Sequence, residues 1–103
     1  SEMIAADMAF HHFLYKLSGN ARIAETAASH WSYLRCVMGA VLMTGTTPNE
    51  IWDQHEAILQ AVANGDAALA EQLAREHIEH AANGVLTNLN EVLERQETTR
   101  SAA

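Results

Sequence analysis

The sequence predicts an all-α fold, an antiparallel helical bundle of four helices, from its composition and from the spacing of its apolar residues. Of the 103 residues, 49% are hydrophobic and 18% are charged, which is typical of a folded domain and not of a disordered tail. One proline and five glycines leave long stretches in which apolar residues recur at helical intervals. We expect one domain, residues 1–103, which buries only roughly 60 to 70% of the surface exposed by the unfolded chain.

Three short polar segments separate the predicted helices. They are residues 18–20 (Ser-Gly-Asn), 45–48 (Gly-Thr-Thr-Pro) and 64–66 (Asn-Gly-Asp). In the second segment Thr47 can cap a helix whose first residue is Pro48, and Glu50 completes a capping box. This segment therefore predicts the start of the third helix most clearly.

The third polar segment ends one helix and begins the last. Asn64-Gly65 is typical of a helix C-terminus, and Asp66 can cap the helix that follows. We expect this last helix to run to about Gln96, with Asn83-Gly84 as a weak point, and the polar chain from Glu97 onward to fray.

The first helix is apolar on nearly all sides, which indicates a helix surrounded by others. Its apolar residues are Met3, Ile4, Met8, Phe10, Phe13, Leu14 and Leu17. Three further helices are too few to cover such a helix. We therefore expect that the chain is a fragment whose partner helices lie upstream, or that a second copy covers these faces in a homodimer.

The excess of acidic residues excludes direct binding of nucleic acid by this chain. Thirteen acidic and six basic residues give a net charge of -7, which repels a phosphate backbone. Cys36 is the single cysteine, so no internal disulfide can form. No apolar run approaches the roughly 18 residues that a membrane span needs, and residues 3–7 do not resemble a signal peptide. A cytoplasmic protein is expected.

Four polar residues fall on the predicted inward faces of three helices. On the first helix, Asp7 and His11 share a face with Met3 or Ile4, Met8 and Leu14. On the third helix the inward residues are Ile51, Trp52, His55, Ile58, Leu59 and Val62. On the fourth they are Ala70, Leu73, His77 and Ala81.

These four residues predict a metal site. A buried carboxylate costs several kcal/mol unless it is compensated, and no lysine or arginine shares the face of Asp7. Asp7 and His11, four residues apart, can ligate one cation together. His55 and His77 lie at about 15 and 18 Å from the turn between their helices, so they are nearly level. To bring both pairs together, the second helix must tilt or bend near Gly39, because a straight helix from Asn20 to Thr44 separates them by more than about 10 Å.

Ordinary structural roles remain open for each of the four. A histidine on an apolar face is more often a hydrogen-bonded core residue than a metal ligand, and Asp7 and His11 could simply bond to each other. His12, His30 and His80 are weaker candidates, because the first and last lie one step off the inward faces and His30 adjoins Trp31. A non-metal interaction module with core histidines is therefore one alternative.

Two sequence blocks point to a known family. The first is a D-x-x-x-H motif, Asp7-Met8-Ala9-Phe10-His11, followed by Leu14 and the turn Ser18-Gly19-Asn20. The second comprises His55, Ile58, Ala61, Gly65-Asp66 and Ala70, with His77 downstream. In these blocks, which extend over most of the chain, the sequence resembles the FCD domain, the C-terminal ligand-binding domain of the FadR subfamily of GntR transcription regulators.

The resemblance implies a sensing function. In many members an aspartate and three histidines hold a divalent metal, and the matching residues are Asp7, His11, His55 and His77. Such a donor set suits Zn, Ni, Mn or Fe and leaves positions for water or an effector carboxylate. Members bind small organic acids, which alter how an N-terminal winged helix-turn-helix domain engages DNA. That domain is absent here, and the family's sensing domain usually starts about two helices before the D-x-x-x-H motif, which also suggests a fragment.

Two further expectations concern the effector and catalysis. Arg35, at the margin of the second helix's apolar face, could bind an effector carboxylate, or it could be an ordinary surface arginine, which is the commoner case. A small helical-bundle metalloenzyme is the alternative function. The sequence has no HExxH or ExxH motif, since Trp52 and Ala74 stand three residues before His55 and His77. We therefore expect a non-enzyme.

Overall fold

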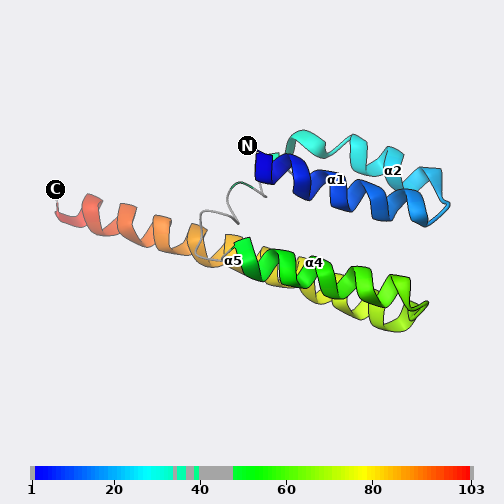
Figure 1. Ribbon diagram of the computed structural model, residues 1–103. Helices are drawn as coiled ribbons and strands as arrows, with labels where there is room; N and C mark the ends of the chain where they lie inside the picture. The colour runs from blue at the N-terminus through cyan, green and yellow to red at the C-terminus, as the bar shows by residue number, and fades with distance from the viewer. Residues whose placement is uncertain (1, 34, 37–38, 40–47, 103) are drawn as a thin grey trace. The chain divides into compact units, whose positions relative to one another are not determined.

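A computed structural model describes residues 2–33, 35–36, 39 and 48–102, and it divides into two compact units, residues 1–40 and 41–103 (Figure 1). Every element that the described residues form is an α-helix, which confirms the predicted all-α class. None of these helices is long and apolar enough to cross a membrane.

The first unit contains α1 (Glu2–Leu17) and α2 (Ala21–Ala28), which lie side by side in opposite directions (Figure 1). The predicted turn joins them. Gly19 has a φ of +71°, a left-handed conformation that glycine adopts without steric cost, and its N–H donates to the Lys16 carbonyl at 3.1 Å. The Asn20 side chain then accepts a hydrogen bond from the Arg22 N–H at 3.1 Å and caps α2.

The single second helix expected from Asn20 to Thr44 is wrong, because α2 ends at Ala28 and residues 29–30 form a turn. The Ser29 hydroxyl donates to the Thr26 carbonyl at 2.7 Å, and the His30 N–H donates to the Ala27 carbonyl at 3.0 Å. A serine hydroxyl bonded to a nearby carbonyl offers the backbone an alternative to the helical ladder. The interruption therefore comes before Gly39, which is itself helical, while residues 40–47 lie outside the described part.

The second unit is an antiparallel hairpin of α4 (Pro48–Ala63) and α5 (Ala67–Ala102). Pro48 is the first residue of α4, as predicted, whereas its expected cap, Thr47, lies outside the described residues. At the other end Asp66 N–H donates to the Ala61 carbonyl at 2.9 Å and Gly65 N–H to the Val62 carbonyl at 3.0 Å. These two bonds form a Schellman motif, which satisfies the last carbonyls of α4.

Asp66 caps α5, which confirms the prediction for this residue. Its Oδ1 accepts a hydrogen bond from the Leu69 N–H at 3.1 Å. Since Gly65 and Asp66 define the turn by local interactions, they set which residues of α4 and α5 lie level with one another.

We expect Gly65→Val to lower the free energy of unfolding by about 1–2 kcal/mol. Gly65 has a φ of +72°, where a β-branched side chain crowds the following carbonyl. Gly65→Asn is the matched control, because asparagine tolerates this conformation better. Urea unfolding followed by circular dichroism measures both, and equal stabilities of the two variants would contradict this role of Gly65.

The last helix is longer than predicted, because α5 continues through Gly84 and ends at Ala102 instead of fraying from Glu97. The hydroxyls of Thr98 and Thr99 donate at 3.0 Å to carbonyls one turn earlier in the helix. At 1.5 Å per residue, the 36 residues of α5 extend about 54 Å and the 16 of α4 about 24 Å. The C-terminal half of α5 therefore passes the end of α4 (Figure 1).

The buried residues of the second unit form a narrow face of α4 and one position of α5. They are Ile51, His55, Ile58, Ala61 and His77. Trp52, Leu59 and Val62 were also expected to face inward, but they remain 37–44% exposed. Each lies one helical step, about 100°, from a buried residue, so these three side chains flank the buried face instead of belonging to it.

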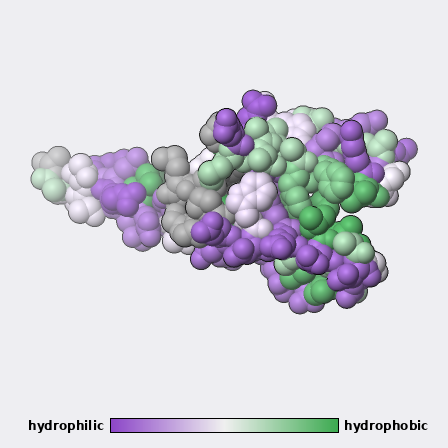
Figure 2. Space-filling model, in the orientation of Figure 1, coloured by the Kyte–Doolittle hydropathy of each residue, from purple (hydrophilic) through white to green (hydrophobic). Residues whose placement is uncertain are grey.

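Hydrophobic residues also reach the surface in both units, as Figure 2 shows by their green colour. On the predicted inward face of α1, the residues from Ile4 to Leu14 are partly buried, but Met3, the alternative first residue of that face, is 37% exposed. Phe13 and Leu17 are 49% and 54% exposed. Since no residue of α1 is fully buried, the described residues do not surround this helix as its composition predicts. Leu86, Leu89 and Leu93 of α5 are 48–56% exposed.

Candidate metal centre

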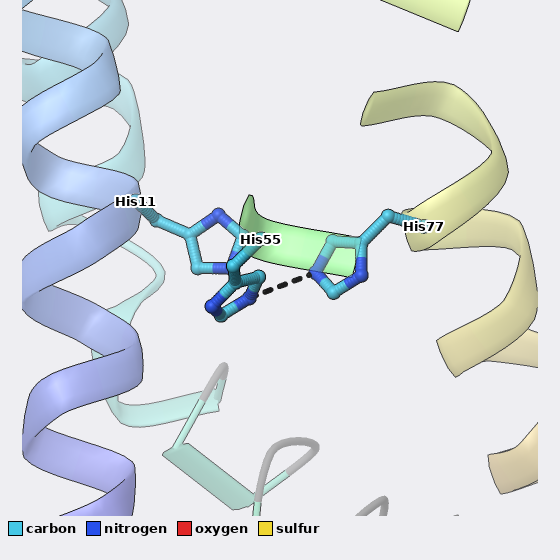
Figure 3. A group of neighbouring side chains, drawn as sticks. All are labelled: His11, His55 and His77. Carbon is cyan, nitrogen blue, oxygen red and sulfur yellow. Dashed lines mark hydrogen bonds between the residues drawn. The ribbon is translucent and has the colours of Figure 1, made fainter. Parts of the chain in front are cut away.

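Two histidines meet at the centre of the α4–α5 hairpin. The Nε2 atoms of His55 and His77 lie 3.3 Å apart, and the two rings point toward each other (Figure 3). Their side chains are almost inaccessible, with 2% and 8% exposure. Trp52 packs edge-to-face against the His55 ring at a centroid distance of 4.8 Å. The nearly level positions predicted from the distance of each histidine to the turn therefore correspond to direct contact.

Gln54 contacts the other nitrogen of His77. The His77 Nδ1 and the Gln54 Oε1 are 2.6 Å apart, and because an amide oxygen only accepts, the Nδ1–H donates. In a neutral imidazole the lone pair then resides on Nε2, the nitrogen that faces His55. Gln54 is not among the residues predicted for the site. Its position next to His55, one helical step away on α4, was the available signal.

Asp7 and His11 form a second pair on α1, as their spacing predicts. Asp7 Oδ1 and His11 Nε2 lie 3.3 Å apart, and the side chains are 16% and 12% exposed. The Phe10 ring packs edge-to-face against His11 with centroids 5.5 Å apart. One helical turn thus holds a carboxylate oxygen and an imidazole nitrogen close together.

The negative charge of Asp7 also affects the pKa of Tyr15, which is not among the predicted site residues. Burial first, and the negative charge of Asp7 second, raise the pKa of the Tyr15 hydroxyl above its usual value of 10.0. The Tyr15 ring lies 6.4 Å from that of Trp31. Both effects disfavour a phenolate on this side of the first unit.

The raised pKa of Tyr15 predicts how the stability of the metal-free protein changes at alkaline pH. Because its folded pKa is raised, this residue leaves stability unchanged below about pH 10, the unfolded value. Stability then falls as pH rises from about 10 to the folded pKa, since only the unfolded state releases the proton. In a Tyr33→Phe background Tyr15 is the single tyrosine, and absorbance at 295 nm should give a midpoint above 10 that Asp7→Asn lowers. A midpoint at or below 10 would contradict this.

The weaker candidates occupy less enclosed positions. His12 is partly buried, while His30 and His80 are exposed. His80 lines a groove of the second unit together with Asp53, Glu76 and His77. Arg35, the predicted effector contact, is exposed on the first unit.

The donor atoms of each pair fit a divalent transition metal. Ligands about 2.0–2.2 Å from a tetrahedral ion lie about 3.3–3.6 Å from each other. The His55–His77 separation of 3.3 Å and the Asp7–His11 separation of 3.3 Å both meet this condition. Imidazole nitrogen with one carboxylate oxygen is also the donor chemistry that zinc and its neighbours in the first transition row accept.

Comparison with known proteins identifies the family. The FCD domain matches residues 1–80, and the chain belongs to the FCD domain family. The match includes both candidate pairs and ends within α5.

The chain is also similar to a protein described as a transcriptional regulator. The chain is 32% identical over 77 residues to a Streptomyces ambofaciens protein described as an uncharacterized HTH-type transcriptional regulator in an unstable DNA locus. The aligned part makes up 75% of this chain and 33% of that protein, so the chain spans about a third of the relative's length. No solved structure matches the chain.

Proposed function

We propose that this chain is the effector-sensing domain of a GntR/FadR-type transcription regulator. Membership of the FCD family and the similarity to an HTH-type transcriptional regulator support this function. DNA would be contacted through a separate N-terminal winged helix-turn-helix domain, because the net charge of -7 makes this chain itself a poor match for phosphate.

We further propose that Asp7, His11, His55 and His77 bind one divalent metal ion, with Zn, Ni, Mn and Fe as the candidates. The observation that carries this proposal is the presence of two donor pairs, each with the spacing of two ligands on one ion. When bound, the ion would supply a Lewis-acidic position for a carboxylate effector. One carboxylate and three neutral imidazoles leave a net positive charge at the site, which favours an anionic ligand.

The effector would be a small organic acid, and Arg35 is a candidate second contact for its carboxylate. Effector binding would act on a homodimer and favour one arrangement of its subunits, which biases the attached DNA-binding domains by differential affinity. We assign no catalytic function. Glu56 and Glu76, the acidic residues next to the two hairpin histidines, are exposed, and Glu76 accepts a hydrogen bond from Gln72 at 3.1 Å.

Elemental analysis of the purified protein tests the metal site. We expect about one metal per chain in the wild type, none in His77→Ala, and full occupancy in His80→Ala, which alters an exposed histidine of the same helix. If the wild type holds no metal even after reloading with zinc, nickel or manganese, the four residues are core polar groups and not ligands.

The regulator assignment has its own test, which uses the full-length protein. Small hydroxy, keto and sugar acids should change its affinity for operator DNA, and removal of the metal should abolish that response. An unchanged DNA affinity with every acid would contradict the effector proposal, whereas a response that survives metal removal would contradict only the metal's part in it.

A further inference from the structure

We propose that Gln54 is a positioning residue for His77, which it holds as the Nδ1–H tautomer so that Nε2 is ready to bind a metal. This inference rests on the proposed metal site and deepens it. It assigns a function to a residue that lies outside the predicted ligand set.

The geometry places His77 between two consecutive residues of α4. Gln54 Oε1 lies 2.6 Å from His77 Nδ1, and His55 Nε2 lies 3.3 Å from His77 Nε2. Gln54 is partly buried and His77 is 8% exposed. Both ring nitrogens of one α5 residue are therefore held from α4, which fixes the position and rotation of the imidazole.

The chemistry makes the two histidines unequal. Since the Gln54 oxygen can only accept, neutral His77 carries its proton on Nδ1 and a lone pair on Nε2. His55 can donate its own Nε2–H to that lone pair in the metal-free protein. To act as a second ligand through Nε2, His55 must carry its proton on Nδ1 instead, whereas His77 needs no change. His77 is thus preorganised and His55 changes tautomer.

An outer hydrogen bond of this kind orients a metal-binding histidine and raises its basicity. Loss of such a partner typically weakens metal binding 10–100-fold. Gln54→Leu removes the acceptor at similar size, and Gln54→Glu keeps an acceptor at the same position. Gln60→Leu makes the same apolar change at an exposed position of α4 and is the matched control.

The test combines a spectroscopic and a binding measurement on the whole chain. Long-range ¹H–¹⁵N spectra of histidine-labelled protein report the tautomer of each ring, with His77 assigned by its absence in His77→Ala. Zinc dissociation constants come from competition with a chelator. We expect wild-type His77 to be the Nδ1–H tautomer with and without zinc. Gln54→Leu should give mixed tautomers and a 10–100-fold weaker zinc affinity, while Gln54→Glu and Gln60→Leu should stay within about tenfold of wild type.

Different failures point to different errors. A wild type that binds zinc, with Gln54→Leu unchanged in tautomer and affinity, would overturn the assignment of Gln54 and leave the metal site intact. Equal weakening by Gln54→Leu and Gln54→Glu would show that the acceptor is not what matters and would also overturn it. A wild type that takes up no zinc would overturn the metal site, and Gln54 would then position no ligand.

Discussion

Replacing His77 with alanine is expected to abolish stoichiometric zinc binding and to lower the free energy of unfolding by about 2–4 kcal/mol. The His77 side chain is 8% exposed and contacts His55 at Nε2 and Gln54 at Nδ1. Its removal would leave a cavity and two partly or fully buried polar groups that lose a partner, and each such group costs about 1–3 kcal/mol.

Chelator competition and urea unfolding of metal-free protein measure the two effects separately. His80→Ala serves as the control, because His80 is an exposed histidine on the same helix. A His77→Ala variant with wild-type stability but no zinc would indicate that the site tolerates the cavity. Retained stoichiometric zinc binding would instead exclude His77 from the ligand set.

Zinc at 100 times its dissociation constant is expected to stabilise the domain by about 2.7 kcal/mol. For a chain of about 100 residues this corresponds to a melting temperature roughly 10–20 °C higher. The physical reason is that the proposed ligands come from different helices, so an ion would bind only the folded chain and its binding free energy would add to that of folding.

Thermal melts with zinc and with excess chelator measure this shift, and Asp7→Asn is the informative variant. Asparagine keeps the size of the Asp7 side chain but removes the negative charge that would offset the cation. We expect a smaller zinc-dependent shift in Asp7→Asn than in the wild type. Equal shifts would mean that the carboxylate of Asp7 is not a ligand.

Local features of the chain were predictable because they depend on neighbouring residues. The turn at Gly19, the Schellman motif at Gly65, the cap at Asp66 and the start of α4 at Pro48 all follow from capping and backbone preferences over a few residues. The contact between Asp7 and His11 follows from helical periodicity, since residues four apart share a face.

The pairing of His55 with His77 was predictable for a related reason. Once a short turn joins two antiparallel helices, the number of residues from each histidine to that turn sets their relative height. The sequence alone thus determined the all-α class, the hairpin and its two central histidines, together with the carboxylate–histidine pair of α1.

Other features depended on competition that only tertiary structure resolves. The interruption at Ser29 reflects a hydroxyl that competes for a backbone carbonyl, an outcome that helix propensity does not predict. The apolar residues of α4 predict a broad inward face, but the tertiary structure buries only the centre of that face. Trp52, Leu59 and Val62 lie at its edges and are exposed. The contact of Gln54 with His77 was not predictable from the sequence. A hydrogen bond between residues 23 positions apart depends on how both helices are rotated about their axes. The periodicity of either helix alone does not determine that rotation.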